Sequence, residues 1–160
     1  MRKVFALLAT LLMLALVAQF FLAASGAFDA APNDESFQPH RALGYAIFLF
    51  AVLLTIVAAL ALMPGRVIGM TALVAGLTVV QVLIAVLARA FNDTGDNSTT
   101  AGQLVFGLHA INGLIVLALA GTVVRRARAL ARSGVTVPPV GVGNRDGMSG
   151  PAAGLAQPGS

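Results

Sequence analysis

The chain has no cysteine and no tryptophan, and it contains a single tyrosine. Without cysteine, the protein cannot form disulfide bonds, iron–sulfur clusters or thiolate metal sites. Charged residues are also scarce, at 10% of 160 residues, whereas hydrophobic residues make up 58%. An ordinary soluble domain has roughly 25% charged residues, and so few charges could not cover the surface of a domain of this size. The composition therefore predicts an integral membrane protein.

The few charged residues are biased toward arginine. Ten basic residues face six acidic ones, which gives a net charge of +4, and Lys3 is the single lysine. Basic chains often bind nucleic acid, but here the basic residues flank apolar runs, which is typical of membrane proteins. The lipid bilayer is thus the expected partner, and nucleic acid is not. The bias toward arginine, alanine, glycine and valine is associated with GC-rich bacterial genomes, so we expect the bacterial cytoplasmic membrane.

Four long apolar runs organise the chain. They cover residues 4–25, 42–63, 67–88 and 104–124. Each has about the 20 residues that a helix needs to cross the hydrocarbon core, and only a helix satisfies its backbone groups within one segment. Pro64 and Gly65 predict a tight turn between the second and third runs, while polar loops separate the others. We therefore predict an all-α fold, an antiparallel four-helix transmembrane bundle over residues 1–133.

Local signals refine the ends of these helices. Ser36 is the expected N-cap of the second helix, and Ser98 or Thr99 that of the fourth. The first run could also be a cleaved signal peptide, because Arg2 and Lys3 precede it. Its apolar stretch, however, exceeds the roughly 7–15 residues of a signal sequence, which favours a retained transmembrane helix. Residues 134–160 are rich in glycine and proline and predict a disordered tail.

The charges predict the orientation of the bundle. Basic residues precede the first run, separate the second from the third and follow the fourth, whereas the two longer loops carry the acidic residues. Under the positive-inside rule both termini are cytoplasmic and the longer loops lie outside. An even number of spans agrees, because it returns both termini to one side.

Polar side chains inside the spans are the candidates for function, because they are costly in hydrocarbon and usually face the bundle interior. The set consists of Gln19, His40, Gln81, His109 and Asn112. In the predicted orientation all of them lie toward the outer side of the membrane. Each predicted helix contributes at least one of them.

The two histidines share the pattern H-x-x-x-G, in His40 to Gly44 and in His109 to Gly113. Residues four apart lie on one face of a helix, so each glycine leaves room for a flat ligand beside the imidazole. A haem held between two helices by two histidines fits this pattern, and such six-coordinate iron suits electron transfer. We therefore predict His40 and His109 as axial ligands of a b-type haem. Arg41 and Asn112 would hydrogen-bond or pair with a propionate.

The two halves of the chain also resemble each other. Gln19 precedes the first H-x-x-x-G as Gln81 precedes the second, which predicts two related hairpins with the histidine helices diagonally opposite. His40 lies just before its apolar run, whereas His109 lies inside its own. Their depths would therefore differ by about 10 Å unless both helices extend beyond the apolar limits.

The element His40, Arg41, Leu43, Gly44 and Tyr45, followed two helices later by His109, resembles one half of heme A synthase. The resemblance implies a four-helix bundle in which histidines of the second and fourth helices face a haem near the outer side. That family has a catalytic carboxylate three residues before the first histidine, where this chain has Phe37. The chain is also similar to an uncharacterised group of small actinobacterial four-helix membrane proteins, which implies a fold and no activity.

Two functions therefore remain open. In the first, the protein is a small b-type-cytochrome-like membrane protein that transfers electrons, with Gln19, Gln81 and Asn112 as polar supports and a membrane quinone or respiratory protein as partner. No catalytic residue is assigned. In the second, it is a non-catalytic structural or accessory membrane protein without a cofactor, and its polar residues serve helix packing. A transporter is disfavoured, because the apolar runs hold no acidic residue for ion coupling.

Overall fold

The computed structural model describes residues 1–91 and 99–133, and in this part of the chain the helices are joined by short turns, without strands. The elements are α1 (Arg2–Ala27), α2 (Asn33–Ser36), α3 (Gln38–Leu60), α4 (Gly65–Ala90) and α5 (Thr100–Ser133). Four helical segments are long and apolar enough to cross a membrane: α1, α2 with α3, α4 and α5. The predicted loop 92–98 and the predicted tail 134–160 lie outside the described residues.

Each predicted apolar run overlaps one of these helices, but the helix ends differ from the runs. α5 continues as regular helix through its arginines to Ser133, well past the predicted limit at residue 124. α3 ends at Leu60, so the prediction that the second span reaches Met63 is wrong. Leu62 has a positive φ of 50°, and the ring of Pro64 disfavours helical geometry in the residue before it. The chain therefore leaves the helix ahead of the proline.

The predicted caps are half right. Thr99 caps α5, because its Oγ1 accepts a hydrogen bond from the amide of Gly102 at 3.0 Å. Ser36 does not cap α3, contrary to prediction. Its hydroxyl donates to the carbonyl of Pro32 at 3.2 Å within the short helix α2, and Phe37 takes the N-cap position of α3. The polar loop thus forms a helical turn of its own that the sequence pattern did not indicate.

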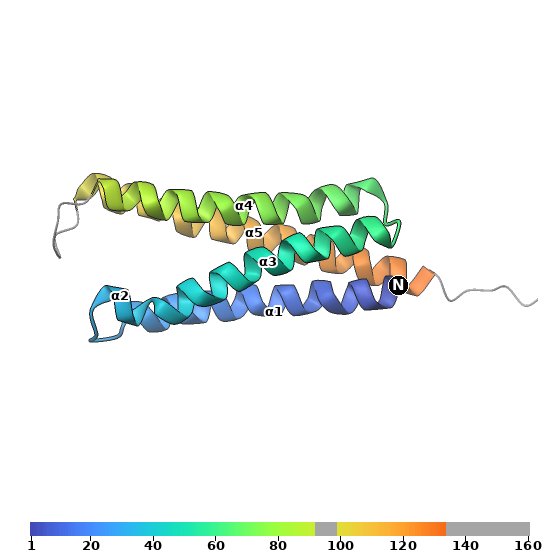
Figure 1. Ribbon diagram of the computed structural model, residues 1–160, viewed down its shortest axis with the longest axis horizontal. Helices are drawn as coiled ribbons and strands as arrows, with labels where there is room; N and C mark the ends of the chain where they lie inside the picture. The colour runs from blue at the N-terminus through green and yellow to red at the C-terminus, as the bar shows by residue number, and fades with distance from the viewer. Residues whose placement is uncertain (92–98, 134–160) are drawn as a thin grey trace, which may run out of the picture.

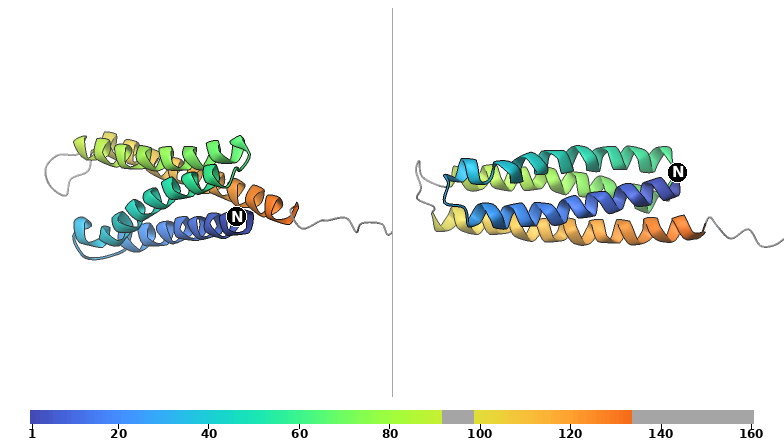
Figure 2. Two further views of the ribbon diagram at one scale, coloured as in Figure 1. Left: turned by 45° about the vertical axis from the view of Figure 1, so that its right-hand side comes forward. Right: turned by 90° about the horizontal axis from the view of Figure 1, so that it is seen from below.

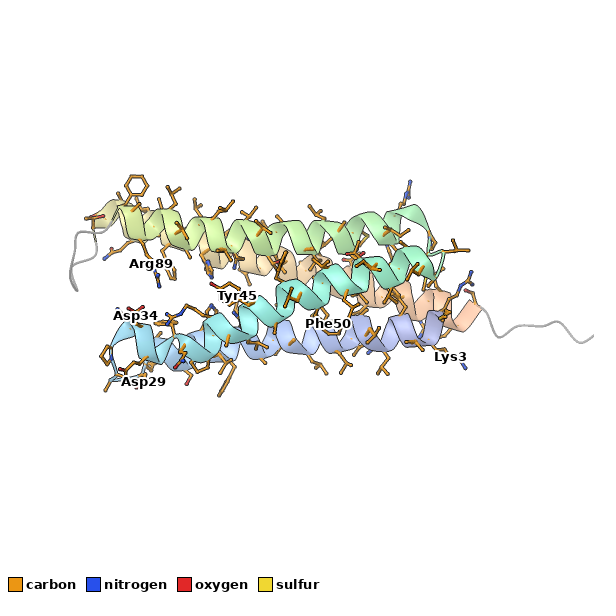
Figure 3. The ribbon with its side chains drawn as sticks, in the orientation of Figure 1. Lys3, Asp29, Asp34, Tyr45, Phe50 and Arg89 are labelled. Atoms are coloured by element: carbon orange, nitrogen blue, oxygen red, sulfur yellow. The ribbon has the colours of Figure 1, made fainter. Side chains whose placement is uncertain are left out.

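The long helices run alternately in opposite directions and pack in the order α1, α3, α4, α5 around a ring, so α3 and α5 lie diagonally opposite (Figure 1). Met1, the turn between α3 and α4 and the end of α5 lie at one end, called here the N-terminal end (Figure 2). α2 lies at the other, the α2 end. Lys3 marks the N-terminal end, and Asp29 and Asp34 mark the α2 end (Figure 3).

The interior is packed unevenly along the bundle. The buried core residues fall within positions 5–16 of α1, 47–63 of α3 and the following turn, 67–75 of α4 and 116–127 of α5, all in the half nearer the N-terminal end. Toward the α2 end, no residue is buried in four facing stretches: 17–25, 38–46, 79–87 and 103–111. In the same direction the α1–α3 pair diverges from the α4–α5 pair (Figures 1 and 2). One half of the bundle is thus closely packed and the other is loosely packed.

The outer surface is apolar. Large hydrophobic side chains are exposed along every long helix, among them Phe21, Leu49, Val86 and Leu104, each at least 60% exposed. Water-soluble proteins rarely expose contiguous apolar patches larger than a few hundred Å². This surface is suited to lipid, in agreement with the predicted membrane environment.

Ala58 tests the packed half. Its side chain is fully buried between helices, whereas the next residue, Ala59, is exposed. We expect Ala58→Leu to lower the free energy of unfolding by about 1–3 kcal/mol, because added methylene groups overpack a filled interior. Ala59→Leu, the matched control, should change it little. Thermal unfolding of both variants in detergent measures the difference, and equal stability would contradict the described packing.

Candidate functional site

The two histidines lie against each other inside the bundle. His40 of α3 and His109 of α5 have ring centroids 6.1 Å apart, with their planes inclined by 52°. The depth mismatch of about 10 Å that the apolar limits implied is absent. Both helices extend past those limits, since α3 begins at Gln38 and α5 runs on to Ser133. The extension of both helices thus brings the two rings together, while their role as ligands stays a prediction.

Each imidazole is held by the main chain of a neighbouring helix. Nδ1 of His40 lies 3.1 Å from the carbonyl oxygen of Gln19, and Nδ1 of His109 lies 3.1 Å from that of Gln81. A carbonyl oxygen only accepts, so Nδ1 carries the hydrogen and donates in both cases. Nε2 of each neutral ring is then unprotonated and keeps its lone pair. We refer to Gln19, His40, Gln81 and His109 as the histidine layer.

The two glycines of the H-x-x-x-G pattern face the side chains of these glutamines. A Cβ atom on Gly44 would lie 3.1 Å from Nε2 of Gln19, and one on Gly113 would lie 3.2 Å from Nε2 of Gln81. Phe20 also reaches Gly113, and its Cζ would lie 3.3 Å from a Cβ atom there. The structure therefore fills the space over each glycine with a glutamine carboxamide. That this space also accommodates a flat ring stays a prediction.

The two halves differ in how the glutamine side chain is held. Asn112 is buried, and its Nδ2 donates both to Oε1 of Gln81 at 2.7 Å and to the carbonyl of Leu77 at 2.9 Å. The equivalent position in α3, three residues after the histidine, is Leu43, which has no such donor. Oε1 of Gln19 is buried and has no hydrogen-bond partner in the described part of the chain. In the structure Asn112 thus supports Gln81, and its contact with a ligand stays a prediction.

Aromatic rings flank both imidazoles, and sequence reasoning missed them. Phe37 meets His40 edge-to-face, with centroids 6.2 Å apart, and Phe106 stacks on His109 at 5.2 Å. Each phenylalanine stands three residues before its histidine, where a helix places side chains on one face. The shared pattern F-x-x-H-x-x-x-G was thus visible in the sequence. The two rings limit how far the imidazoles can rotate.

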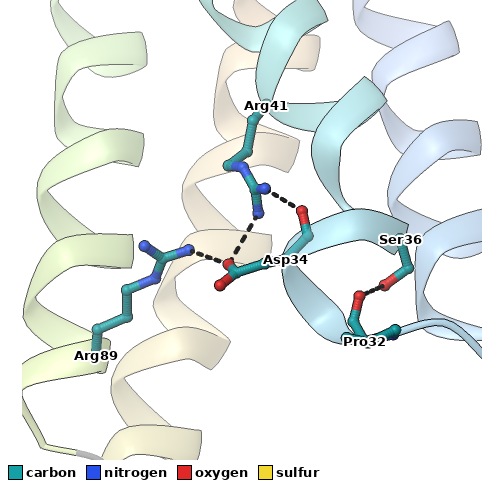
Figure 4. Close-up of polar contacts among 5 residues, drawn as sticks. All are labelled: Pro32, Asp34, Ser36, Arg41 and Arg89. Carbon is teal, nitrogen blue, oxygen red and sulfur yellow. Dashed lines mark hydrogen bonds and ion pairs between the residues drawn. The ribbon is translucent and has the colours of Figure 1, made fainter.

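Arg41 lies at the α2 end, outside the histidine layer. It forms an ion pair with the carboxylate of Asp34 at 3.6 Å and donates to the carbonyl of the same residue (Figure 4). Arg89 of α4, which the sequence analysis did not single out, contacts the same carboxylate at 3.7 Å. Asp34 therefore links α2 to α4 across the two helix pairs. Its side chain is 88% exposed, so this link adds little stability.

The donor set suits a haem better than a metal ion bound by protein alone. Among residues 1–91 and 99–133, no three His, Cys, Asp or Glu side chains come together to hold a metal ion. Two neutral imidazoles with unprotonated Nε2 atoms are the axial pair of a six-coordinate haem, although Nε2 of His40 also lies 3.3 Å from the carboxamide nitrogen of Gln19. With about 2 Å from a metal to each nitrogen, two imidazoles on one metal have their ring centroids about 6 Å apart. The observed separation of 6.1 Å agrees with this requirement.

One family model matches the chain. It describes a family of unknown function, DUF6220, and it matches residues 19–89. The match includes Gln19, His40 and Gln81 and ends before His109, so it covers less than half of the chain. No curated protein and no solved structure matches the sequence. The match is consistent with an uncharacterised family, and it carries no activity.

Asn112→Leu tests the polar contact beneath the histidine layer. Leucine is the residue that α3 has at the equivalent position, Leu43, so a leucine side chain is compatible with this place in the bundle. The change removes both hydrogen bonds of Asn112. We expect a loss of about 0.6–2 kcal/mol in unfolding free energy, the range measured for hydrogen bonds between membrane helices. Unfolding in detergent provides the measurement. Ile111→Leu, at an exposed neighbouring position, is the control and should be neutral.

Proposed function

We propose that the protein is a small integral membrane cytochrome that binds a b-type haem between His40 and His109 and transfers electrons. The observation that carries the proposal is the pair of adjacent imidazoles, whose ring centroids lie 6.1 Å apart and each of which donates its Nδ1 hydrogen to a main-chain carbonyl. A hydrogen bond of this kind fixes the tautomer and makes the other ring nitrogen a better ligand. The bound haem would supply one-electron redox chemistry.

The protein's own groups have separate parts in this proposal. The Nε2 atoms of His40 and His109 would hold the iron, and the carbonyls of Gln19 and Gln81 orient the rings. The stretches around this layer contain no buried residue, in contrast to the packed half. Gly44 and Gly113 let the glutamine side chains lie close to the helix backbones. Arg41, at the α2 end, would be available to a propionate when it leaves Asp34.

The orientation of the bundle is part of the proposal. The N-terminal end carries the basic residues Arg2, Lys3, Arg66, Arg125, Arg126, Arg128 and Arg132. The α2 end carries the acidic residues of its loop. By the positive-inside rule both termini are cytoplasmic, and the histidine layer lies toward the outer face of a bacterial cytoplasmic membrane. A membrane quinone or a respiratory protein at that face would be the redox partner, and no group transfer is assigned.

A second function is favoured by different contacts. The polar side chains of the histidine layer bond between helices: Gln19 to His40 in one half, Asn112 to Gln81 in the other. Such bonds hold membrane helices together without any cofactor. The alternative is therefore a non-catalytic structural or accessory membrane protein. It differs from the first proposal in a property that is easily observed, the absorption spectrum.

The spectrum of protein purified from haem-replete cells tests the proposal. We expect a Soret band and the sharp reduced bands of a low-spin haem bound by two histidines. His40→Ala and His109→Ala should each convert this spectrum or abolish it. Removal of either histidine already abolishes the six-coordinate iron, so the spectrum of the double variant should differ little from the spectra of the single variants.

Leu108→Ala provides the control for this experiment. It changes an exposed side chain beside His109, and it should leave the spectrum as in the wild type. Colourless wild-type protein that is otherwise folded would contradict the cytochrome and support the accessory protein. In that case His40→Ala and His109→Ala would affect stability alone, as lost interhelical hydrogen bonds do.

Reporter fusions test the orientation separately. A reporter that is active only in the cytoplasm should be active after Ser160, and an export-dependent reporter should be active at Asp96. The expectation follows from four spans with the basic residues inside. The same two reporters at exchanged positions serve as controls and should be inactive. Export of the C-terminus would contradict the proposed orientation.

A further inference from the structure

The two histidines differ in what surrounds their Nε2 atoms. Nε2 of His40 lies 3.3 Å from Nε2 of Gln19, and with the hydrogen of the ring on Nδ1 it accepts from this carboxamide. Nε2 of His109 has no hydrogen bond from any residue that the structure describes. The lone pair of His109 is therefore available without rearrangement, whereas that of His40 is shared with a donor of the protein.

A single position accounts for this difference. In the second half, Asn112 binds Oε1 of Gln81. In the first half, Leu43 stands at the same place, and Oε1 of Gln19 has no partner in the described residues. The carboxamide of Gln19 instead donates to the carbonyl of His40 at 2.8 Å and approaches its ring. The two halves of the chain therefore differ at the glutamine that lies next to a histidine: Gln19 contacts the ring of His40 through its carboxamide.

We propose that His40 is an exchangeable ligand whose place on the iron is taken by a small neutral molecule, a diatomic gas, while His109 stays bound. The inference rests on the proposed haem site. In the exchange the bond from iron to Nε2 of His40 breaks, the lone pair of the gas forms the new bond, and no electron is transferred. The freed lone pair of His40 accepts the hydrogen bond from Gln19. Leu43 and Phe37 beside this site disfavour a charged ligand, because burying it costs desolvation.

Carbon monoxide is the probe, titrated into the reduced full-length protein in detergent. We expect the wild type to bind it. Gln19→Leu removes the competing carboxamide but keeps the main-chain carbonyl that holds Nδ1, so His40 should bind the iron more firmly. The affinity for carbon monoxide should then fall by about tenfold, the effect of one hydrogen bond of ordinary strength. Gln81→Leu is the comparison in the other half and should have a smaller effect than Gln19→Leu. Leu108→Ala, at an exposed position outside the histidine layer, is the control and should change the affinity by less than about twofold.

Leu43→Asn provides a second variant in case Gln19→Leu does not fold. It supplies Gln19 with the donor that Asn112 gives to Gln81, so it should also weaken binding of carbon monoxide and raise the low-spin fraction. Wild-type protein without haem would contradict the proposed function and with it this inference. Haem-bound protein that does not bind carbon monoxide, or binds it equally in the wild type and these variants, contradicts the inference alone. A larger effect of Gln81→Leu than of Gln19→Leu contradicts it too, because His109 would then be the ligand that exchanges.

Discussion

Two hydrogen bonds, one from each imidazole Nδ1 to a main-chain carbonyl of the neighbouring helix, determine what the interior of this bundle offers to a ligand. They join α1 to α3 and α4 to α5 at the same depth. They also place the hydrogen of each ring on Nδ1 and leave the lone pair on Nε2. Since the acceptors belong to the main chain, their positions depend on the helices and not on any side chain. The chemistry of the layer is therefore as rigid as the bundle itself.

The rigidity comes from the other half of the molecule. Between positions 5–16 of α1 and 116–127 of α5 the helices pack through alanine, valine and leucine side chains that exclude solvent. Sites carried by helices hold their geometry better than sites carried by loops. Here four helices fixed at one end position four polar residues toward the other end. The packed half acts as the support, while the contacts around the histidine layer itself are loose.

Sequence reasoning reached the helices, the facing histidines and the Thr99 cap, because hydropathy and caps act locally. It did not predict the side-chain contacts that depend on how neighbouring helices pack. The H-x-x-x-G spacing places Gly44 and His40 on one face, but it does not say that Gln19 fills the space above the glycine. Arg41 adjoins His40 in sequence, yet consecutive residues point about 100° apart around a helix, which sends Arg41 toward Asp34.

The loose packing around the histidine layer has a consequence for assembly. Segments with few buried contacts open at a lower free energy than the closely packed parts of the same protein. The α1–α3 and α4–α5 pairs can therefore separate locally at the α2 end while the packed half stays folded. In the proposed cytochrome, a haem dissolved in the membrane would then reach the two imidazoles sideways, from the lipid, after the chain has been inserted. Insertion of the polypeptide and loading of its interior would be independent events.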